Sequence, residues 1–240
     1  MISFFRRLRN KLLSQNKFYK YLLYAIGEIV LVVIGILIAL QINNWNEEQK
    51  NISLEKELLE GIHNDLARDT LQINNRFFRS YIDLLQSKKR YDSVVNLDDN
   101  KIKIKFLDSL FQRCIRQRNT FFPITGTYKT IINSGLSGII RDKVLFKRIQ
   151  ELYDRRYEIL IASGARIDAL SSDIRYKHAH VNTLTDKERL RAYKGSELRT
   201  EIDHWFSRME DFSGNMSDTK NALKKVLIQI EEEIKKMEKD

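Results

Sequence analysis

The stretch from Leu22 to Ile42, LLYAIGEIVLVVIGILIALQI, decides how this chain is organised. As an α-helix, its 21 residues extend over about 30 Å, which is the thickness of the hydrocarbon core of a bilayer. From Ile29 to Leu40 the residues are apolar on every face, whereas a helix in a soluble core keeps a polar stripe. The sequence therefore predicts one transmembrane helix over residues 21–42.

The residues on either side of this stretch predict its orientation. Residues 1–20 contain six lysines and arginines and no acid, whereas Asn43 to Glu48, NNWNEE, contains two acids and no base. Basic flanks stay on the cytoplasmic side of a membrane. We therefore expect a basic cytoplasmic segment over residues 1–20 and an extracytoplasmic domain over residues 43–240. Tyr24 and Trp45 lie where an aromatic belt is expected at the two interfaces.

Two alternatives remain open for the N-terminal region. A cleaved signal peptide would place Gln41 directly before the cut, where a small residue is preferred, so we expect a signal anchor. The basic start also has apolar residues at helical spacing, FFRRLRNKLL from Phe4. This segment either lies on an anionic inner leaflet or only sets the topology.

One face of the predicted transmembrane helix carries small residues and a carboxyl group. Ala25, Glu28, Val32, Gly35 and Ala39 follow the 3,4,3,4 spacing of a single helix face. Small residues four apart allow two helices to approach closely in a membrane. We expect this face to mediate helix association. The alternative is a lone helix in lipid with a tolerated carboxyl group.

Composition restricts the remaining possibilities. The chain has 42 Lys+Arg, 32 Asp+Glu, one Cys, one Pro and nine Gly in 240 residues. A single Cys excludes an internal disulfide, and so few turn-forming residues disfavour an all-β fold. Acids and bases are interleaved beyond the transmembrane stretch, as on a solvated helical surface, so nucleic acid is not an expected partner.

Apolar periodicity predicts a helical bundle beyond the membrane. A first long helix is expected from about Asn46 to Val95, continuing the transmembrane helix outward, and a second from about Asp142 to Lys177. The apolar stripe of the second long helix is predicted at Leu145, Ile149, Leu152, Arg156, Ile159, Ser163, Ile167, Leu170 and Ile174. The fold class is therefore all-α, with one N-terminal transmembrane helix.

Shorter helices are expected between and after these two. The alternating segment Lys101 to Phe106, KIKIKF, is interpreted as an extended entry to a helix from Phe106 to Gln117. Three further helix boundaries are indicated by local signals: Thr127 with closure at Ser134-Gly135, the capping box Thr185-Asp-Lys-Glu188 with an interruption at Gly195, and Ser217 as the cap of a last helix.

The segment from Tyr24 to Glu47, YAIGEIVLVVIGILIALQINNWNE, resembles the signature of a bacterial membrane-protein family, domain of unknown function 6090, found in Bacteroidota. Two weaker matches follow, at Leu59 to Leu66 and at Tyr128 to Tyr153. The resemblance implies a single-pass protein of the bacterial inner membrane with a periplasmic domain. It implies no activity, cofactor or catalytic residue.

Two Glu-x-x-His units raise the possibility of a metal site. Glu60 and His63 form one unit, and Glu201 and His204 form the other. A di-iron four-helix bundle takes such a unit from each of two helices. Because Glu60 and His63 flank the apolar stripe instead of lying at its centre, surface residues are the favoured interpretation. Cys114 is interpreted as a half-buried residue on a helix.

No catalytic motif is found elsewhere in the chain. Phosphate-binding Gly-rich loops, GxSxG, HExxH and paired CxxC patterns are all absent from the sequence. We therefore expect a non-enzymatic protein without a cofactor. Its expected partners are the lipid bilayer and either a second copy of itself or another membrane protein, for which the helical domain serves as an interaction surface or scaffold. The alternative is a membrane-tethered metalloprotein of di-iron type.

Overall fold

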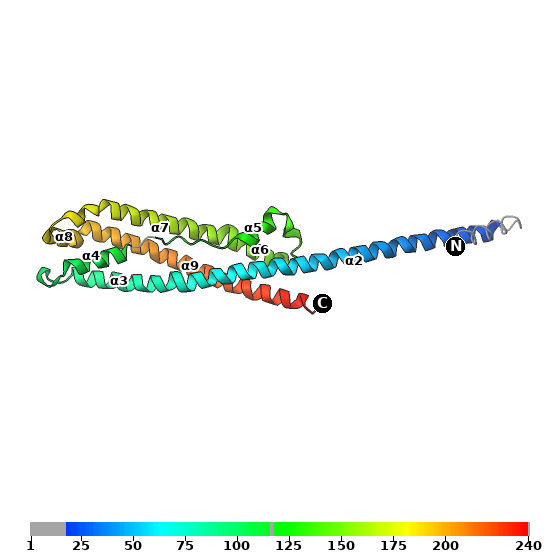
Figure 1. Ribbon diagram of the computed structural model, residues 1–240, viewed down its shortest axis with the longest axis horizontal. Helices are drawn as coiled ribbons and strands as arrows, with labels where there is room; N and C mark the ends of the chain where they lie inside the picture. Colours follow the sequence, from blue (N-terminus) through cyan, green and yellow to red (C-terminus); the bar gives the residue numbers. More distant parts are fainter. Residues whose placement is uncertain (1–17, 116–117, 240) are drawn as a thin grey trace. The chain divides into compact units, whose positions relative to one another are not determined.

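The computed structural model describes residues 18–115 and 118–239 (Figure 1). All regular secondary structure in these residues is helical, and no β-strand occurs among them. The all-α prediction is confirmed, including one helix near the N-terminus that is long and apolar enough to cross a membrane. Residues 1–17 of the predicted basic segment, and the predicted helix end at Gln117, lie outside the described residues.

The chain consists of two compact units that meet between Leu54 and Glu55. Helix α2, Phe18–Gln72, contributes residues to both. In the first unit, the described residues 18–54 are helical throughout. The domain boundary predicted at residues 42 and 43 marks the change from apolar to polar sequence, and the helix continues through it without a break.

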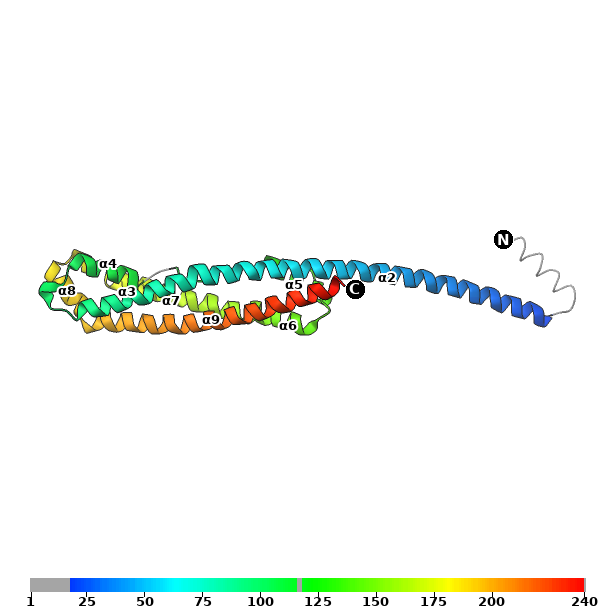
Figure 2. The same ribbon diagram turned by 90° about the horizontal axis from the view of Figure 1, so that it is seen from below.

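The second unit is an elongated bundle built on three long helical stretches (Figures 1 and 2). α9 forms the third stretch and lies beside the other two in both views. The first stretch comprises the end of α2, a π-helical turn at Ile73–Phe78 and α3, Arg79–Val95; the second comprises α6, Lys143–Glu151, a π-helical turn at Leu152–Tyr157 and α7, Glu158–Lys177; the third is α9, Ser196–Met237.

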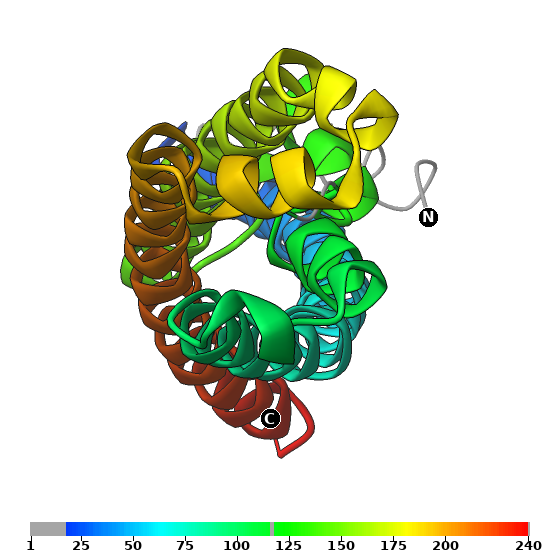
Figure 3. The same ribbon diagram turned by 90° about the vertical axis from the view of Figure 1, so that its left-hand side faces the viewer.

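Short helices connect the long stretches. They are a 3-10 turn at Asp99–Lys101, α4 at Ile104–Cys114, α5 at Gly126–Asn133, 3-10 turns at Leu136–Gly138 and Ala179–Thr183, and α8 at Asp186–Lys194. In the end-on view of Figure 3, α8 (yellow) and α4 (green) lie at the end of the bundle nearest the viewer. They pack against α9 and α3, respectively, and against each other.

Several helix ends follow local sequence signals, as predicted. The Asp142 carboxylate accepts hydrogen bonds from the backbone N–H groups of Val144 and Leu145, which caps α6. Thr185 and Glu188 form the reciprocal hydrogen bonds of a capping box at α8. Gly135, with φ of +67°, follows α5 in the left-handed region that favours glycine.

Helix α4 begins earlier than predicted, at Ile104 instead of Phe106. It spans Ile104–Cys114, so only Ile102 and Lys103 of the alternating segment form an extended entry. The buried face of α4 explains its register, because Leu107, Phe111 and Cys114 follow a spacing of four and three residues. This face packs against α3.

The predicted start of a last helix at Ser217 is wrong. α9 runs without interruption from Ser196 to Met237. The reason is tertiary packing. The buried face of α9 continues through Phe212, Met216, Thr219 and Leu223. Burial of these side chains offsets the cost of about 1 kcal/mol for a glycine at position 214 in the helix interior.

The predicted stripe of the second long helix is correct up to Leu152 and again at Ile167 and Ile174. Beyond Leu152, Arg156, Ile159, Ser163 and Leu170 are not buried, and Ile159 is 44% exposed. The π-helical turn at Leu152–Tyr157 adds one residue and rotates everything after it by about 100°. The buried face therefore continues at Tyr157, Leu160, Gly164, Ile167, Ser171 and Ile174.

The core of the second unit lies between the three long stretches. Trp205 of α9 is completely buried at its centre and donates a hydrogen bond from Nε1 to the Ser171 hydroxyl of α7 at 2.7 Å. The contact satisfies the indole N–H, as burial of a Trp requires. Phe77, from the first π-helical turn, packs edge-on against Phe212 of α9 at 5.2 Å between ring centroids.

Candidate functional site

The predicted association face lies on the exposed apolar part of α2. Within the first unit, Ala25 is partly exposed and Glu28, Val32, Gly35 and Ala39 are exposed. A Cβ atom added at Gly35 would meet no atom within 4 Å. The side chains of Leu22 to Ile42 therefore have no cover from the described residues of this unit. Helix association through this face stays a prediction.

The first Glu-x-x-His unit lies beside the C-terminal part of α9. His63 Nε2 is 3.0 Å from Glu231 Oε1. Glu60 is 3.9 Å from Lys56 Nζ, and Lys56 also pairs with Glu238 at 2.8 Å. These are surface contacts between α2 and α9, of a kind that contributes up to about 1 kcal/mol.

The second Glu-x-x-His pair, Glu201 and His204, lies near the other end of α9. Glu201 accepts hydrogen bonds from Lys177 and from His178 Nε2, the latter at 2.6 Å, and His204 is exposed. His178 is buried at the end of α7, so this contact anchors the end of α7 to α9.

The two Glu-x-x-His units do not come together in this structure. His63 contacts Glu231, which is 30 residues beyond Glu201 on the same helix and therefore about 45 Å away along its axis. Within residues 18–115 and 118–239, no group of three His, Cys, Asp or Glu side chains has the geometry to hold a metal ion. The geometry therefore gives no support to a shared di-iron site.

In the second unit, several carboxylates accept hydrogen bonds from backbone N–H groups. Residues 119–125, here called the strap, connect α4 to α5 without helical structure. Backbone N–H groups outside a helix or sheet need other partners. Asp168 of α7 accepts hydrogen bonds from the N–H groups of Asn119 at 2.7 Å and Thr120 at 3.0 Å, and from the Thr120 hydroxyl at 2.7 Å.

Helix α2 holds the other end of the strap and the start of α5. Asp69 accepts a hydrogen bond from the Ile124 N–H at 3.1 Å, and Asp65 accepts one from the Thr127 N–H at 3.2 Å. The strap also lies very close to α7, because a Cβ atom added at Gly164 would lie 2.7 Å from the Thr120 Cα. The strap is therefore fixed between α2 and α7.

Asp69 is completely buried and is joined to a group of tyrosines. Its Oδ2 accepts a 2.7 Å hydrogen bond from the Tyr157 hydroxyl. Burial raises the pKa of Asp69 to about 6, although the hydrogen bonds from Tyr157 and Ile124 act in the opposite direction. Burial and the nearby Asp69 also raise the pKa of Tyr157, which keeps its proton for this hydrogen bond.

Two further tyrosines extend this group. Tyr128 of α5 donates a 2.7 Å hydrogen bond to Asp154, and its ring stacks on Tyr153 at 4.3 Å between centroids. The Tyr153 ring in turn meets Tyr157 edge-on at 5.2 Å. Both tyrosines of this last pair come from the π-helical turn, whose extra residue places them on the buried side.

A fourth carboxylate, Glu55, binds the loop before α6. It is completely buried and accepts hydrogen bonds from the Arg141 backbone N–H at 2.6 Å and from Arg141 Nε at 2.7 Å. Charge-assisted bonds of this kind are worth about twice a neutral hydrogen bond. Cys114 was predicted to be half-buried and is completely buried, and burial raises its pKa to about 12, so it is no reactive thiolate.

Glu55 and Asp69 were not predicted as functional residues, although the sequence carries a signal for both. The buried positions of α2 run Glu55, Leu59, Ile62, Leu66, Asp69, Ile73, with spacings of four and three residues. An acidic residue at a core position of such a stripe predicts a buried carboxylate that needs a hydrogen-bond donor. Asp168 lies beside the stripe of α7 and offered no such signal. Together these carboxylates hold backbone segments in place.

Comparison with known proteins identifies the family. The profile described as "Family of unknown function (DUF6090)" matches residues 28–193. The chain belongs to this family. The match confirms the family named on the basis of the segment at Tyr24 to Glu47. No curated protein and no solved structure matches the chain.

The region matched by the family contains the complete carboxylate network. Glu55, Asp65, Asp69, Asp154 and Asp168 all lie inside it, as does the strap that Asp69 and Asp168 hold. Helix α9 lies beyond its end, although α9 supplies Trp205 to the core. The family profile assigns no chemistry to any of these residues.

Proposed function

We propose that this chain is a non-enzymatic, single-pass membrane protein that presents a helical domain as an interaction surface or scaffold. The observation that carries the proposal is the exposure of the apolar segment. Its large apolar side chains from Leu22 to Ile42 are between 45% and 73% exposed. Soluble monomeric proteins rarely expose contiguous apolar surface on this scale, so a bilayer is the natural solvent for it.

The proposed location is the inner membrane of a bacterium, with the N-terminus in the cytoplasm and residues 43–240 in the periplasm. The six bases before the helix and the acidic NNWNEE segment after it support this orientation. Tyr24 and Trp45, both exposed, lie near the ends of the apolar segment, where amphipathic rings favour the interface.

The proposed interaction role rests on the internal structure of the second unit. Its buried carboxylates accept hydrogen bonds from backbone N–H groups, as Asp69 does from Ile124 and Glu55 from Arg141. A rigid helical bundle of this kind provides fixed side-chain positions for a protein partner. The self-association of the membrane helix through Ala25, Glu28, Val32, Gly35 and Ala39 belongs to the same proposal. The geometry does not favour the di-iron alternative, because His63 of α2 contacts α9 at Glu231, about 45 Å along that helix from Glu201.

A topology experiment tests this proposal. A reporter that is active only in the cytoplasm is fused either before Met1 or after Asp240, and the membrane fraction is assayed. We expect activity from the first fusion alone, with the protein remaining in the membrane after washing with high salt. Activity from the second fusion alone contradicts the orientation. Release of a soluble protein that lacks residues 1–41 contradicts the anchor.

A further inference from the structure

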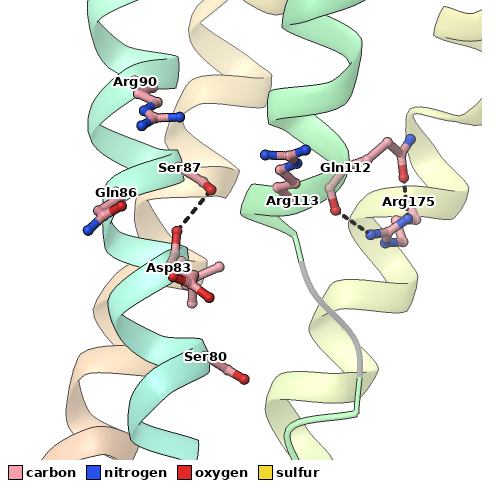
Figure 4. A pocket seen from close by; sticks show the side chains of 9 residues that line it. Ser80, Asp83, Gln86, Ser87, Arg90, Gln112, Arg113 and Arg175 are labelled. Carbon is pink, nitrogen blue, oxygen red and sulfur yellow. Dashed lines mark hydrogen bonds between the residues drawn. The ribbon is translucent and has the colours of Figure 1, made fainter.

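We propose that a cleft between α3, α4 and α7 binds a small phosphate-bearing anion. The cleft has a volume of about 490 Å³ and lies in the second unit. Figure 4 shows Arg90 on α3, Arg113 on α4 and Arg175 on α7 around it. Ligand sites for small molecules typically occupy between about 300 and 1,000 Å³.

Arg175 lines the cleft and is held in place by hydrogen bonds to α4 and Ile115. Its Nε donates a hydrogen bond to the Ile115 carbonyl at 2.9 Å, and its Nη2 donates one to the Gln112 carbonyl at 2.9 Å. It also pairs with the Gln112 side chain. Because these carbonyls belong to the C-terminal end of α4, Arg175 satisfies the open end of that helix and ties it to α7.

Arg90 and Arg113 are available for a ligand. Neither forms an ion pair or a hydrogen bond with any residue in the described part of the chain, and both are exposed at the cleft. By contrast Lys88, only two residues before Arg90, contacts the carboxylates of both Asp92 and Asp203. Asp83 is the one carboxylate that lines the cleft, against three arginines, so the lining carries a net positive charge.

The remaining lining residues suit an oxyanion. Ser80 lines the cleft and provides a hydroxyl donor. The Ser87 hydroxyl donates to the Asp83 carbonyl at 2.9 Å, so it offers no free donor. Guanidinium groups bind phosphate oxygens in a bidentate manner, which a lysine does not reproduce. Two unpaired guanidinium groups from different helices thus fit the two or more charges of a phosphate group.

The phosphate group can belong to a soluble metabolite or to a lipid headgroup. The test therefore uses two probes on the full-length protein in nanodiscs. In the first arm, pyrophosphate is titrated by calorimetry into protein in phosphatidylcholine nanodiscs. In the second arm, phosphatidic acid replaces part of the lipid, and crosslinking measures whether it lies close to the cleft. Saturable one-to-one binding of pyrophosphate identifies a soluble ligand, and phosphatidic acid binding alone identifies a headgroup.

The variants are Arg90→Gln and Arg113→Gln, with Arg79→Gln as the matched control. Arg79 is an exposed arginine of α3 that does not line the cleft. We expect each cleft variant to weaken binding of the probe by about tenfold or more, and the control to leave it unchanged. Circular dichroism confirms that each variant keeps its helical content. Absence of saturable binding in both arms overturns the proposal, as does an equal loss in Arg79→Gln, which indicates non-specific attraction.

Discussion

At the scale of single residues, Asp69 determines a pH dependence of stability. Its pKa is raised from 3.8 to about 6, so the folded protein holds this proton more tightly than the unfolded chain. The contribution of Asp69 to the free energy of unfolding is therefore fully present below pH 4. It is lost as the pH rises through about 6, with a magnitude on the order of 3 kcal/mol.

Asp69→Asn should remove this pH dependence. The amide oxygen can still accept the hydrogen bond from Ile124, and the Tyr157 hydroxyl can rotate to accept from the amide nitrogen. We expect the free energy of unfolding of the variant, minus that of the wild type, to increase from pH 4 to pH 8 by up to about 3 kcal/mol. Urea unfolding of the full-length protein in detergent measures it. The exposed Asp173, changed to Asn, is the control, and a flat difference for both variants contradicts the assignment.

Two glycines should respond to alanine with opposite signs. At Gly164 an added Cβ lies 2.7 Å from the Thr120 Cα, and because backbone cannot move aside easily we expect a loss of about 1–3 kcal/mol. At Gly214 an added Cβ meets nothing within 4 Å, so alanine should stabilise α9 by about 0.5–1 kcal/mol. Thermal unfolding of both variants measures this. If both destabilise the protein, the open space described around Gly214 is wrong.

At the scale of elements, the strap depends on acceptors supplied by its neighbours. Asp168→Asn replaces one carboxylate oxygen by an amide donor, which then faces the N–H group of Asn119 or Thr120. We expect a loss of stability of about 1–3 kcal/mol and faster hydrogen exchange confined mainly to residues 119–125. Exchange followed by mass spectrometry measures both the rate and its location. Uniformly faster exchange across the bundle, or no change, argues against a local role for Asp168.

The elements that sequence predicts well are those set by local chemistry. The capping box at Thr185 and Glu188 and the turn at Gly135 depend on residues within a few positions, and the structure has both. The end of the first long stretch at Val95 and the start of the second after Asp142 were likewise recognised. Apolar periodicity also predicted the first long helix, in which Leu59, Ile62 and Leu66 are buried.

The errors arise where tertiary contacts decide. No local sequence signal predicts the π-helical turn at Leu152–Tyr157. Because of its extra residue, Leu160 is buried where Ile159 was predicted to be. Ser217 resembles a helix cap, but the buried Met216 and Thr219 keep α9 continuous. The carboxylate network was missed for a similar reason. The donors of Asp69 and Asp168 lie far away in sequence and include backbone N–H groups, which residue type alone does not reveal.

At the scale of the whole molecule, the membrane helix is expected to do more than anchor the domain. Ala25, Glu28, Val32, Gly35 and Ala39 share one face of α2. Gly35 and Ala39 let a second backbone approach, and a carboxyl group shielded by a neighbouring helix is less costly than one that faces lipid. Self-association would bring two or more copies of the second unit to one place on the membrane, which suits a scaffold.

Gly35→Ile should weaken this association, because a branched side chain holds the two backbones apart. Leu37→Phe enlarges a side chain on the opposite face of the helix and serves as the matched control. Interhelical polar contacts in membranes average about 0.6 kcal/mol, so Glu28→Gln should have only a small effect. An oligomerisation reporter that carries residues 18–46 measures all three variants. Equal signals from the wild type, Gly35→Ile and Leu37→Phe mean that the small residues are incidental and that this helix acts only as an anchor.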